Sequence, residues 1–177
     1  MRRRLVCCRW LPSGLWFIVC SLALAQNIPA PGAEPAVAPP PATLEREFFA
    51  VIREGDAKNF LSYIPEKGVN VGPRAEHLSR ADVEHQFAQR RGLYSKLFDS
   101  SCIQSTIKLD NSLRPCSYRE LLTHSEKVRT AATEAVRGGV RQAILVAEVK
   151  NDQCAGLGLI DFIFNEAHGT WELFSAP

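Results

Sequence analysis

Asp161 is the residue whose surroundings in this sequence best suit chemistry. It lies within a run of strand-forming residues, between Ile160 and Phe162, and strand alternation puts it on the same face as Leu159 and Ile163. A carboxylate held among apolar side chains loses solvation, which raises its pKa toward the range that a general base needs. The alternative is that this face lies at the outside or edge of a sheet, where Asp161 is solvated or paired with a basic side chain.

Two further sets of side chains could belong to a catalytic or binding site. Asp82 and His85 are three residues apart on an expected helix and could exchange a proton, but their polar neighbours indicate a solvated helix face. The aromatic residues Tyr94, Phe162 and Trp171 are candidates for lining a binding pocket, although such side chains more often belong to the core.

The usual motifs of catalysis and cofactor binding are missing from the sequence. It has no Gly-x-Ser-x-Gly nucleophile motif, no phosphate-binding Gly-x-x-x-x-Gly-Lys, and no complete glycine pattern of a dinucleotide-binding loop. It also lacks the Cys-x-x-Cys and His-x-His spacings that hold zinc. We therefore expect neither a cofactor nor a metal.

Residues 1–25 predict an export signal. Arginines follow Met1, the segment has no acidic residue, and an apolar run of 11 residues ends in Ala23-Leu-Ala25, which suits signal peptidase. This run is shorter than the roughly 20 residues that span a bilayer, although an uncleaved membrane anchor is the alternative. We expect cleavage after Ala25 and a periplasmic or secreted protein with no membrane association afterwards.

Removal of the export signal changes the charge of the chain. The full sequence has 21 Lys and Arg residues against 19 Asp and Glu residues. Four arginines lie in the signal, so 17 basic residues remain against 19 acidic ones, a net charge of about −2. A near-neutral chain lacks the basic surface that binds nucleic acid.

Three cysteines remain after cleavage, namely Cys102, Cys116 and Cys154. An oxidising compartment favours disulfide formation. Cys102 and Cys116 enclose a polar, turn-rich loop of about 15 residues, so we expect these two to be bridged and Cys154 to be free. The alternative is that all three are reduced and buried as small apolar side chains.

The remainder of the sequence predicts a linker and one domain. Residues 26–43 contain six prolines mixed with Ala and Gly, which is typical of a disordered linker. Over residues 44–177, helical spacing and N-capping residues come first, and strand-like alternation follows at 140–150, 159–165 and 170–175. We therefore expect an α+β fold, with N-terminal helices packed on an antiparallel sheet formed by the C-terminal part.

The segment 127–137 fits a strand or a helix. The Gly138-Gly139 pair favours a hairpin with the following strand, in a register that places Arg129 opposite Glu148.

Two motifs give the domain a resemblance to a known superfamily. Glu47-Phe-Phe-Ala-Val-Ile-Arg-Glu-Gly-Asp56 and His168-Gly-Thr-Trp-Glu-Leu173 resemble the first helix and last strand of nuclear transport factor 2-like (SnoaL-like) proteins. The resemblance covers about residues 44–177. It implies a curved, cone-like antiparallel sheet wrapped by helices around a central cavity. In the enzymes of the superfamily, an acid or a His–Asp pair inside this cavity moves protons.

Three functions follow from these features. The leading expectation is an exported, non-catalytic domain that binds a small apolar ligand or a protein partner. The first alternative is a cofactor-free isomerase or lyase of the same superfamily, with Asp161 as the general base. The second is a structural module that forms a homodimer through its sheet. An enclosed cavity containing a carboxylate would favour the enzyme, and an exposed apolar sheet face would favour the dimer.

Overall fold

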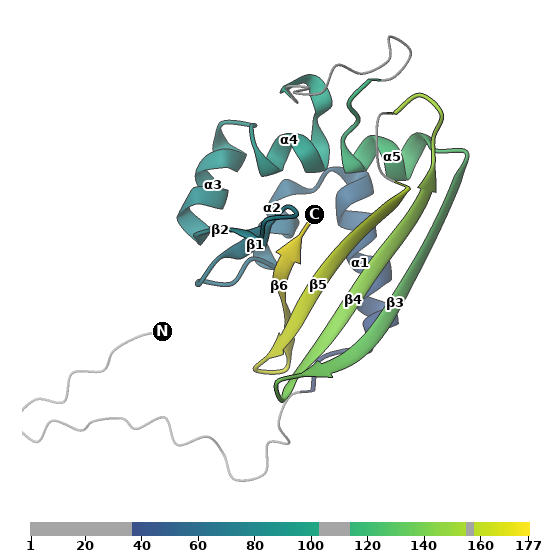
Figure 1. The fold of residues 1–177 in the computed structure, drawn as a ribbon. Coiled ribbons are helices and arrows are strands. Elements are labelled where there is room, and N and C mark those ends of the chain that lie inside the picture. Colours follow the sequence, from purple (N-terminus) through teal and green to yellow (C-terminus); the bar gives the residue numbers. More distant parts are fainter. Residues whose placement is uncertain (1–36, 103–113, 155–157) are drawn as a thin grey trace, which may run out of the picture. The chain divides into compact units, whose positions relative to one another are not determined.

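The computed structural model describes residues 37–102, 114–154 and 158–177 (Figure 1). The helices in this part of the chain are α1 (Pro41–Glu54), α2 (Ala57–Ser62), α3 (Arg80–Ala88), α4 (Leu93–Phe98), the 3-10 helix η1 (Ser100–Cys102) and α5 (Tyr118–His124). The strands are β1 (Val69–Val71), β2 (Glu76–Leu78), β3 (Lys127–Arg137), β4 (Val140–Lys150), β5 (Leu159–Ala167) and β6 (Thr170–Ala176). The predicted α+β class is confirmed. The predicted export signal and the first part of the predicted linker lie outside the described residues.

Reciprocal capping fixes where two of the helices begin. At α3, the Ser79 hydroxyl accepts a hydrogen bond from the Asp82 N–H, and the Asp82 carboxylate accepts one from the Ser79 N–H. Ser117 and Glu120 make the same arrangement at α5. Each of these reciprocal pairs, called a capping box, provides hydrogen-bond acceptors for backbone N–H groups that have no partner inside the helix. The start of α5 is thereby set directly after Cys116.

The described strands form one curved sheet in the order β2-β1-β6-β5-β4-β3 (Figure 1). Neighbouring strands are antiparallel, except that β1 and β6 are parallel. Residues 127–137 form strand β3 with Arg129 opposite Glu148, which confirms the predicted hairpin register and contradicts the helical alternative. Gly138 and Gly139 have positive φ angles of 58° and 79°, as a two-residue hairpin turn requires.

The ring of Phe48 on α1 lies at the centre of the core. Its centroid is 4.8 Å from that of Phe162 and 4.9 Å from that of Phe164, so α1 packs directly on β5. Toward the other helices, the same ring lies 5.6 Å from Phe60 and 5.2 Å from Tyr63. Tilted and edge-to-face pairs of this kind add to the burial energy. These rings fill the space between α1 and the sheet, where the superfamily resemblance implied a cavity.

The opposite face of the sheet is uncovered. In the described part of the chain, no helix lies over the outer face of β3, β4 and β5 (Figure 1). Leu159 and Phe174 are exposed on it, at 57% and 37%, whereas Ile144, Val146 and Ile163 are half-buried. The sheet therefore presents an apolar surface on the side away from α1.

The chain joins the fold earlier than the sequence predicts. Ala38 is buried, and its N–H donates to Oε1 of Glu166 at 3.1 Å. The indole N–H of Trp171 donates to the Pro39 carbonyl at 2.8 Å. Helix α1 then begins at Pro41, because proline suits a first helical position, where an N–H has no partner. Ala38, Pro39 and the first turn of α1 therefore lie within the fold, although the sequence places them in the linker.

Replacing Trp171 by Phe should loosen this attachment. The variant keeps a ring but lacks the indole N–H, so the Pro39 carbonyl loses its donor. We expect faster amide exchange at Ala38 and a loss of about 1 kcal/mol from the free energy of unfolding. Hydrogen exchange and denaturant unfolding measure the two effects. The control is Phe174→Leu on the same strand, and unchanged exchange at Ala38 in the Trp171 variant would contradict the attachment.

Candidate functional site

Asp161 lies on the uncovered face of the sheet and is exposed. Its neighbours Ile160 and Phe162 point to the other face, where both are fully buried. The structure therefore contradicts a desolvated Asp161 at the bottom of an apolar cavity and agrees with the alternative, a solvated carboxylate on an outer face that it shares with Leu159 and Ile163. Both faces of β5 carry apolar residues, and the face with the phenylalanines packs against α1 and becomes the core.

A cavity of about 550 Å³ lies beside Asp161, where β6 leaves β5 to pair with β1. Its volume falls within the range of small-molecule sites, roughly 300–1,000 Å³. It is lined by the β1–β2 turn (Gly72, Pro73), α4 (Lys96), the segment entering α5 and its first residue (Pro115, Cys116, Tyr118), β5 (Leu159, Asp161) and the end of β6 (Ser175, Ala176, Pro177). Most of this lining is small or apolar.

Three of the larger lining residues have polar side chains: Lys96 and Asp161 are charged, and Tyr118 has a phenol. Lys96 and Asp161 are both exposed, and neither takes part in an ion pair with another described residue. Tyr118 is buried, with its ring 6.1 Å from that of Phe162. Burial, and secondarily the negative charge of Asp161, raises the pKa of Tyr118 to about 12. The phenol therefore keeps its proton at neutral pH and can donate a hydrogen bond.

The predicted pocket residues Tyr94, Phe162 and Trp171 do not lie together, and none of them lines this cavity. Tyr94 packs with Phe87 and Phe98 at centroid distances of 5.5 and 5.4 Å. Phe162 is in the core, and Trp171 holds the residues that precede α1. Aromatic residue type alone does not distinguish these structural positions from a binding site.

Asp82 and His85 are both exposed on α3, which confirms the solvated helix face. Hydrogen bonds from Ser79 lower the pKa of Asp82, because they favour the charged carboxylate. Asp82 therefore acts as a capping residue.

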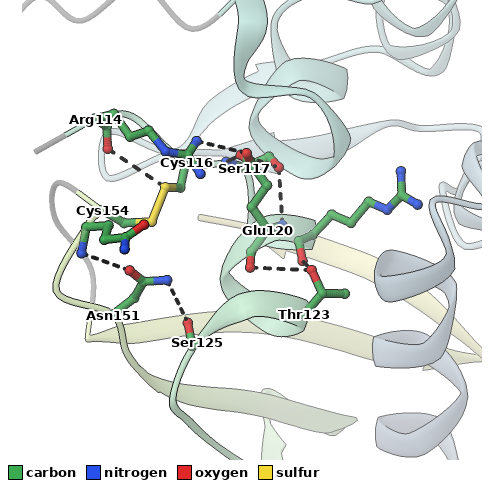
Figure 2. The surroundings of a disulfide bond; sticks show 10 residues. Arg114, Cys116, Ser117, Glu120, Thr123, Ser125, Asn151 and Cys154 are labelled. Atoms are coloured by element: carbon green, nitrogen blue, oxygen red, sulfur yellow. Dashed lines mark hydrogen bonds and ion pairs between the residues drawn. A yellow bond between two sulfur atoms is a disulfide. The ribbon is translucent and has the colours of Figure 1, made fainter.

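A disulfide joins Cys116 to Cys154, with the two Cα atoms 5.6 Å apart (Figure 2). The predicted Cys102–Cys116 bridge was therefore wrong. Arg114 forms an isolated parallel bridge with Cys154, and its N–H donates to the Gln153 carbonyl at 3.1 Å. The residues that lead into α5 thus run alongside the connection between β4 and β5. Backbone pairing between distant segments, and not a short loop, brings the two sulfur atoms together.

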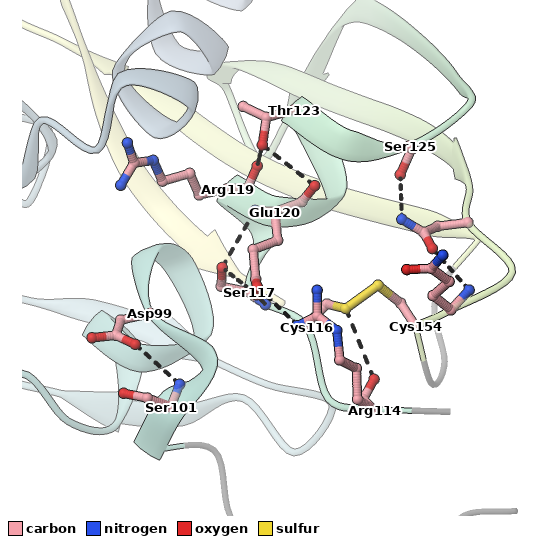
Figure 3. Close-up of polar contacts among 12 residues, drawn as sticks. Asp99, Ser101, Arg114, Cys116, Ser117, Arg119, Glu120, Thr123, Ser125 and Cys154 are labelled. Atoms are coloured by element: carbon pink, nitrogen blue, oxygen red, sulfur yellow. Dashed lines mark hydrogen bonds and ion pairs between the residues drawn. A yellow bond between two sulfur atoms is a disulfide. The ribbon is translucent and has the colours of Figure 1, made fainter. Parts of the chain in front are cut away.

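Glu120 connects this disulfide to α5 (Figure 3). Its carboxylate accepts hydrogen bonds from the Ser117 N–H at 2.8 Å and from Nη1 of Arg114 at 2.9 Å. Burial by itself would raise the pKa of Glu120, but these bonds and one from Ser100 outweigh it and lower the pKa to about 2. The charged carboxylate therefore holds Ser117, directly after Cys116, and Arg114, two residues before it.

The structure offers no metal centre within the residues it describes, since no three His, Cys, Asp or Glu side chains there are grouped to hold an ion. Among the same residues, no helix has the length and apolar character needed to cross a bilayer.

Comparison of the chain with protein-family profiles, with curated proteins and with solved structures gives no significant match.

Sequence reasoning missed two residues of this cavity, Lys96 and Tyr118. The capping pair of Ser117 and Glu120 does predict a helix that begins at Tyr118. Tyr118 lines a cavity because β6 separates from β5, and no local sequence pattern predicts this separation.

Replacing Cys116 and Cys154 together by Ser should lower the free energy of unfolding by about 4 kcal/mol. The two cysteines are 38 residues apart, so the bridge removes much conformational freedom from the unfolded chain. Denaturant unfolding without reductant measures the difference, and reductant should bring the wild type to the level of the double variant. The control is Cys102→Ser, and a loss of similar size in that variant would argue against the observed pairing.

The variant Glu120→Gln tests the charged carboxylate beside the disulfide. Its folded-state pKa of about 2 lies below the ordinary value of 4.5, so its ionised form stabilises the fold. The wild type should therefore be more stable than the variant above about pH 4.5, and this advantage should vanish as the pH falls to about 2. Urea unfolding over a pH series measures it, with the exposed Glu76→Gln as the control. If the difference in unfolding free energy between the wild type and Glu120→Gln does not change with pH, the charge of Glu120 does not stabilise the fold.

Proposed function

We propose that this chain is a non-catalytic binding domain whose ligand site is the cavity between β5 and β6. The observation that carries the proposal is the cavity of about 550 Å³, which has a mostly apolar lining and two exposed charged side chains, Lys96 and Asp161. An apolar surface with a few polar groups is the usual composition of a binding site. The ligand is a small apolar molecule or an apolar segment of a protein partner.

The enzyme alternative loses its support. It required Asp161 to be a desolvated base inside an enclosed cavity, and the side chain is exposed. An exposed carboxylate remains a suitable partner for a cationic group of a ligand. We therefore propose binding, and not proton transfer, as the role of Asp161.

Membership of the nuclear transport factor 2-like superfamily and export remain proposals. The order of helices followed by a curved sheet supports the first, together with Gly55-Asp56 at the end of α1 and Trp171 near the start of β6. The Cys116–Cys154 disulfide supports export through residues 1–25, because such bonds persist in oxidising compartments.

A homodimer is the second candidate function. The uncovered sheet face supports it, because Leu159 and Phe174 are exposed there beside half-buried Ile144, Val146 and Ile163. Association of two such faces would remove these side chains from water.

The fluorescent probe 1-anilinonaphthalene-8-sulfonate tests the binding site, because it combines an apolar ring system with an anion that Lys96 can pair with. We expect the wild type to bind it. Leu159→Asp should weaken binding roughly tenfold, because it places a charge in the apolar lining. The matched control is Val136→Asp at the end of β3, where the side chain is 71% exposed and does not line the cavity.

Equal binding by the two variants, or no binding by the wild type, would contradict the proposed site. Sedimentation of the same samples separates the second candidate, because a dimer through the sheet face would dissociate in Leu159→Asp whether or not the probe is present.

A further inference from the structure

Strand β5 has an open edge over its first residues. Its pairing with β4 runs from Leu159 to Asn165, whereas its pairing with β6 begins only at Ile163. A register shift at Ile163 and Phe164 turns β6 away, and its end pairs with β1 instead. Such shifts bend a strand away from its neighbour. In the described part of the chain, the first part of β5 therefore has no strand on its β6 side.

The register shows which backbone groups face this opening. The Val149 N–H donates to the Gly158 carbonyl directly opposite it, at 3.0 Å, so this is a hydrogen-bonded pair of the antiparallel ladder. Such pairs alternate along a strand, so Ile160 bonds to β4, and Leu159 and Asp161 direct their N–H and C=O groups the other way. Farther along β5, the residues that direct their backbone groups to β6 likewise have odd numbers, as Leu159 and Asp161 do.

The same edge borders the cavity. Leu159 and Asp161 line one side of it, and Ser175 and Ala176 at the end of β6 line the other. Tyr118 contributes a buried side chain to the same lining. Unpaired strand edges are the places where a further chain can add by backbone hydrogen bonding. A cavity that contains such an edge suits an extended peptide better than it suits a compact molecule.

We propose that an extended segment of a partner protein adds to β5 beside Leu159 and Asp161, occupying the cavity as a short strand. This inference rests on the proposed binding function and names its ligand class. The segment runs antiparallel to β5, as β6 does farther along. Asp161 has no ion pair with a described residue, so the partner residue opposite it is Lys or Arg, and the one opposite Leu159 is apolar.

A labelled peptide of the sequence Gly-Thr-Lys-Thr-Val-Thr-Gly, with blocked ends, is the probe. In the antiparallel register its Lys lies opposite Asp161 and its Val opposite Leu159. We expect the full chain to bind this peptide in a fluorescence anisotropy titration. Methylation of the Lys and Val backbone nitrogens removes the two donors that face β5, so it should weaken binding at least roughly tenfold.

The protein variant that tests the same bonds is Asp161→Pro. In the wild type, the Asp161 N–H faces the opening and not β4. Proline therefore removes a hydrogen-bond donor from the open edge and leaves the hydrogen bonds between β5 and β4 intact. The matched control is Asp161→Asn, which keeps the N–H and loses only the charge. We expect a loss of roughly tenfold or more in the proline variant and of about two- to threefold in the asparagine variant.

Equal affinities for methylated and unmethylated peptides would overturn strand addition, and this arm uses only the wild type, so it is independent of how the proline variant folds. Absence of peptide binding, with anilinonaphthalene sulfonate still bound at the cavity, would also overturn it and would leave a small apolar molecule as the ligand. If the sulfonate probe fails as well, the proposed binding function fails with it.

Discussion

The packing of Phe48 against Phe162 and Phe164 is the contact on which the other features of this domain depend. It places α1 across β5, and it decides which face of the central strand is buried. Since side chains alternate along a strand, the same contact sends Leu159 and Asp161 to the uncovered face. The chemical character of the site, an open cavity with an exposed carboxylate, therefore follows from the position of one aromatic ring.

The parts of the fold that local patterns specify could be predicted from the sequence. The pairs Ser79–Asp82 and Ser117–Glu120 cap helices, and such pairs can be recognised in the sequence because a capping box depends only on residues three positions apart. The pairing of Arg129 with Glu148 followed from the two glycines between their strands, because a two-residue turn fixes the register.

The site itself depends on contacts between distant parts of the chain, and these were not predictable. Alternation placed Asp161 on one face of β5 correctly, but both faces are apolar and only packing decides which one is covered. The disulfide was assigned to the shorter loop on grounds of proximity in sequence. In the fold, the residues before α5 lie along the β4–β5 connection, and Cys116 meets Cys154. The attachment of Ala38 through Glu166 likewise depends on a residue far along the chain.

The parallel pairing of β1 with β6 has a consequence for how the domain forms. Asn70 on β1 lies opposite Ser175 on β6, so β1 meets this second neighbour only after every other described element has been made. Contacts between such distant residues form only after a long loop has closed, at a cost in conformational entropy, and they therefore slow folding. The β3–β4–β5 hairpins can form from local contacts, whereas the sheet is completed last at β6. During synthesis, the helical part with the β1–β2 pair would therefore wait with one edge of β1 unpaired until β6 is made.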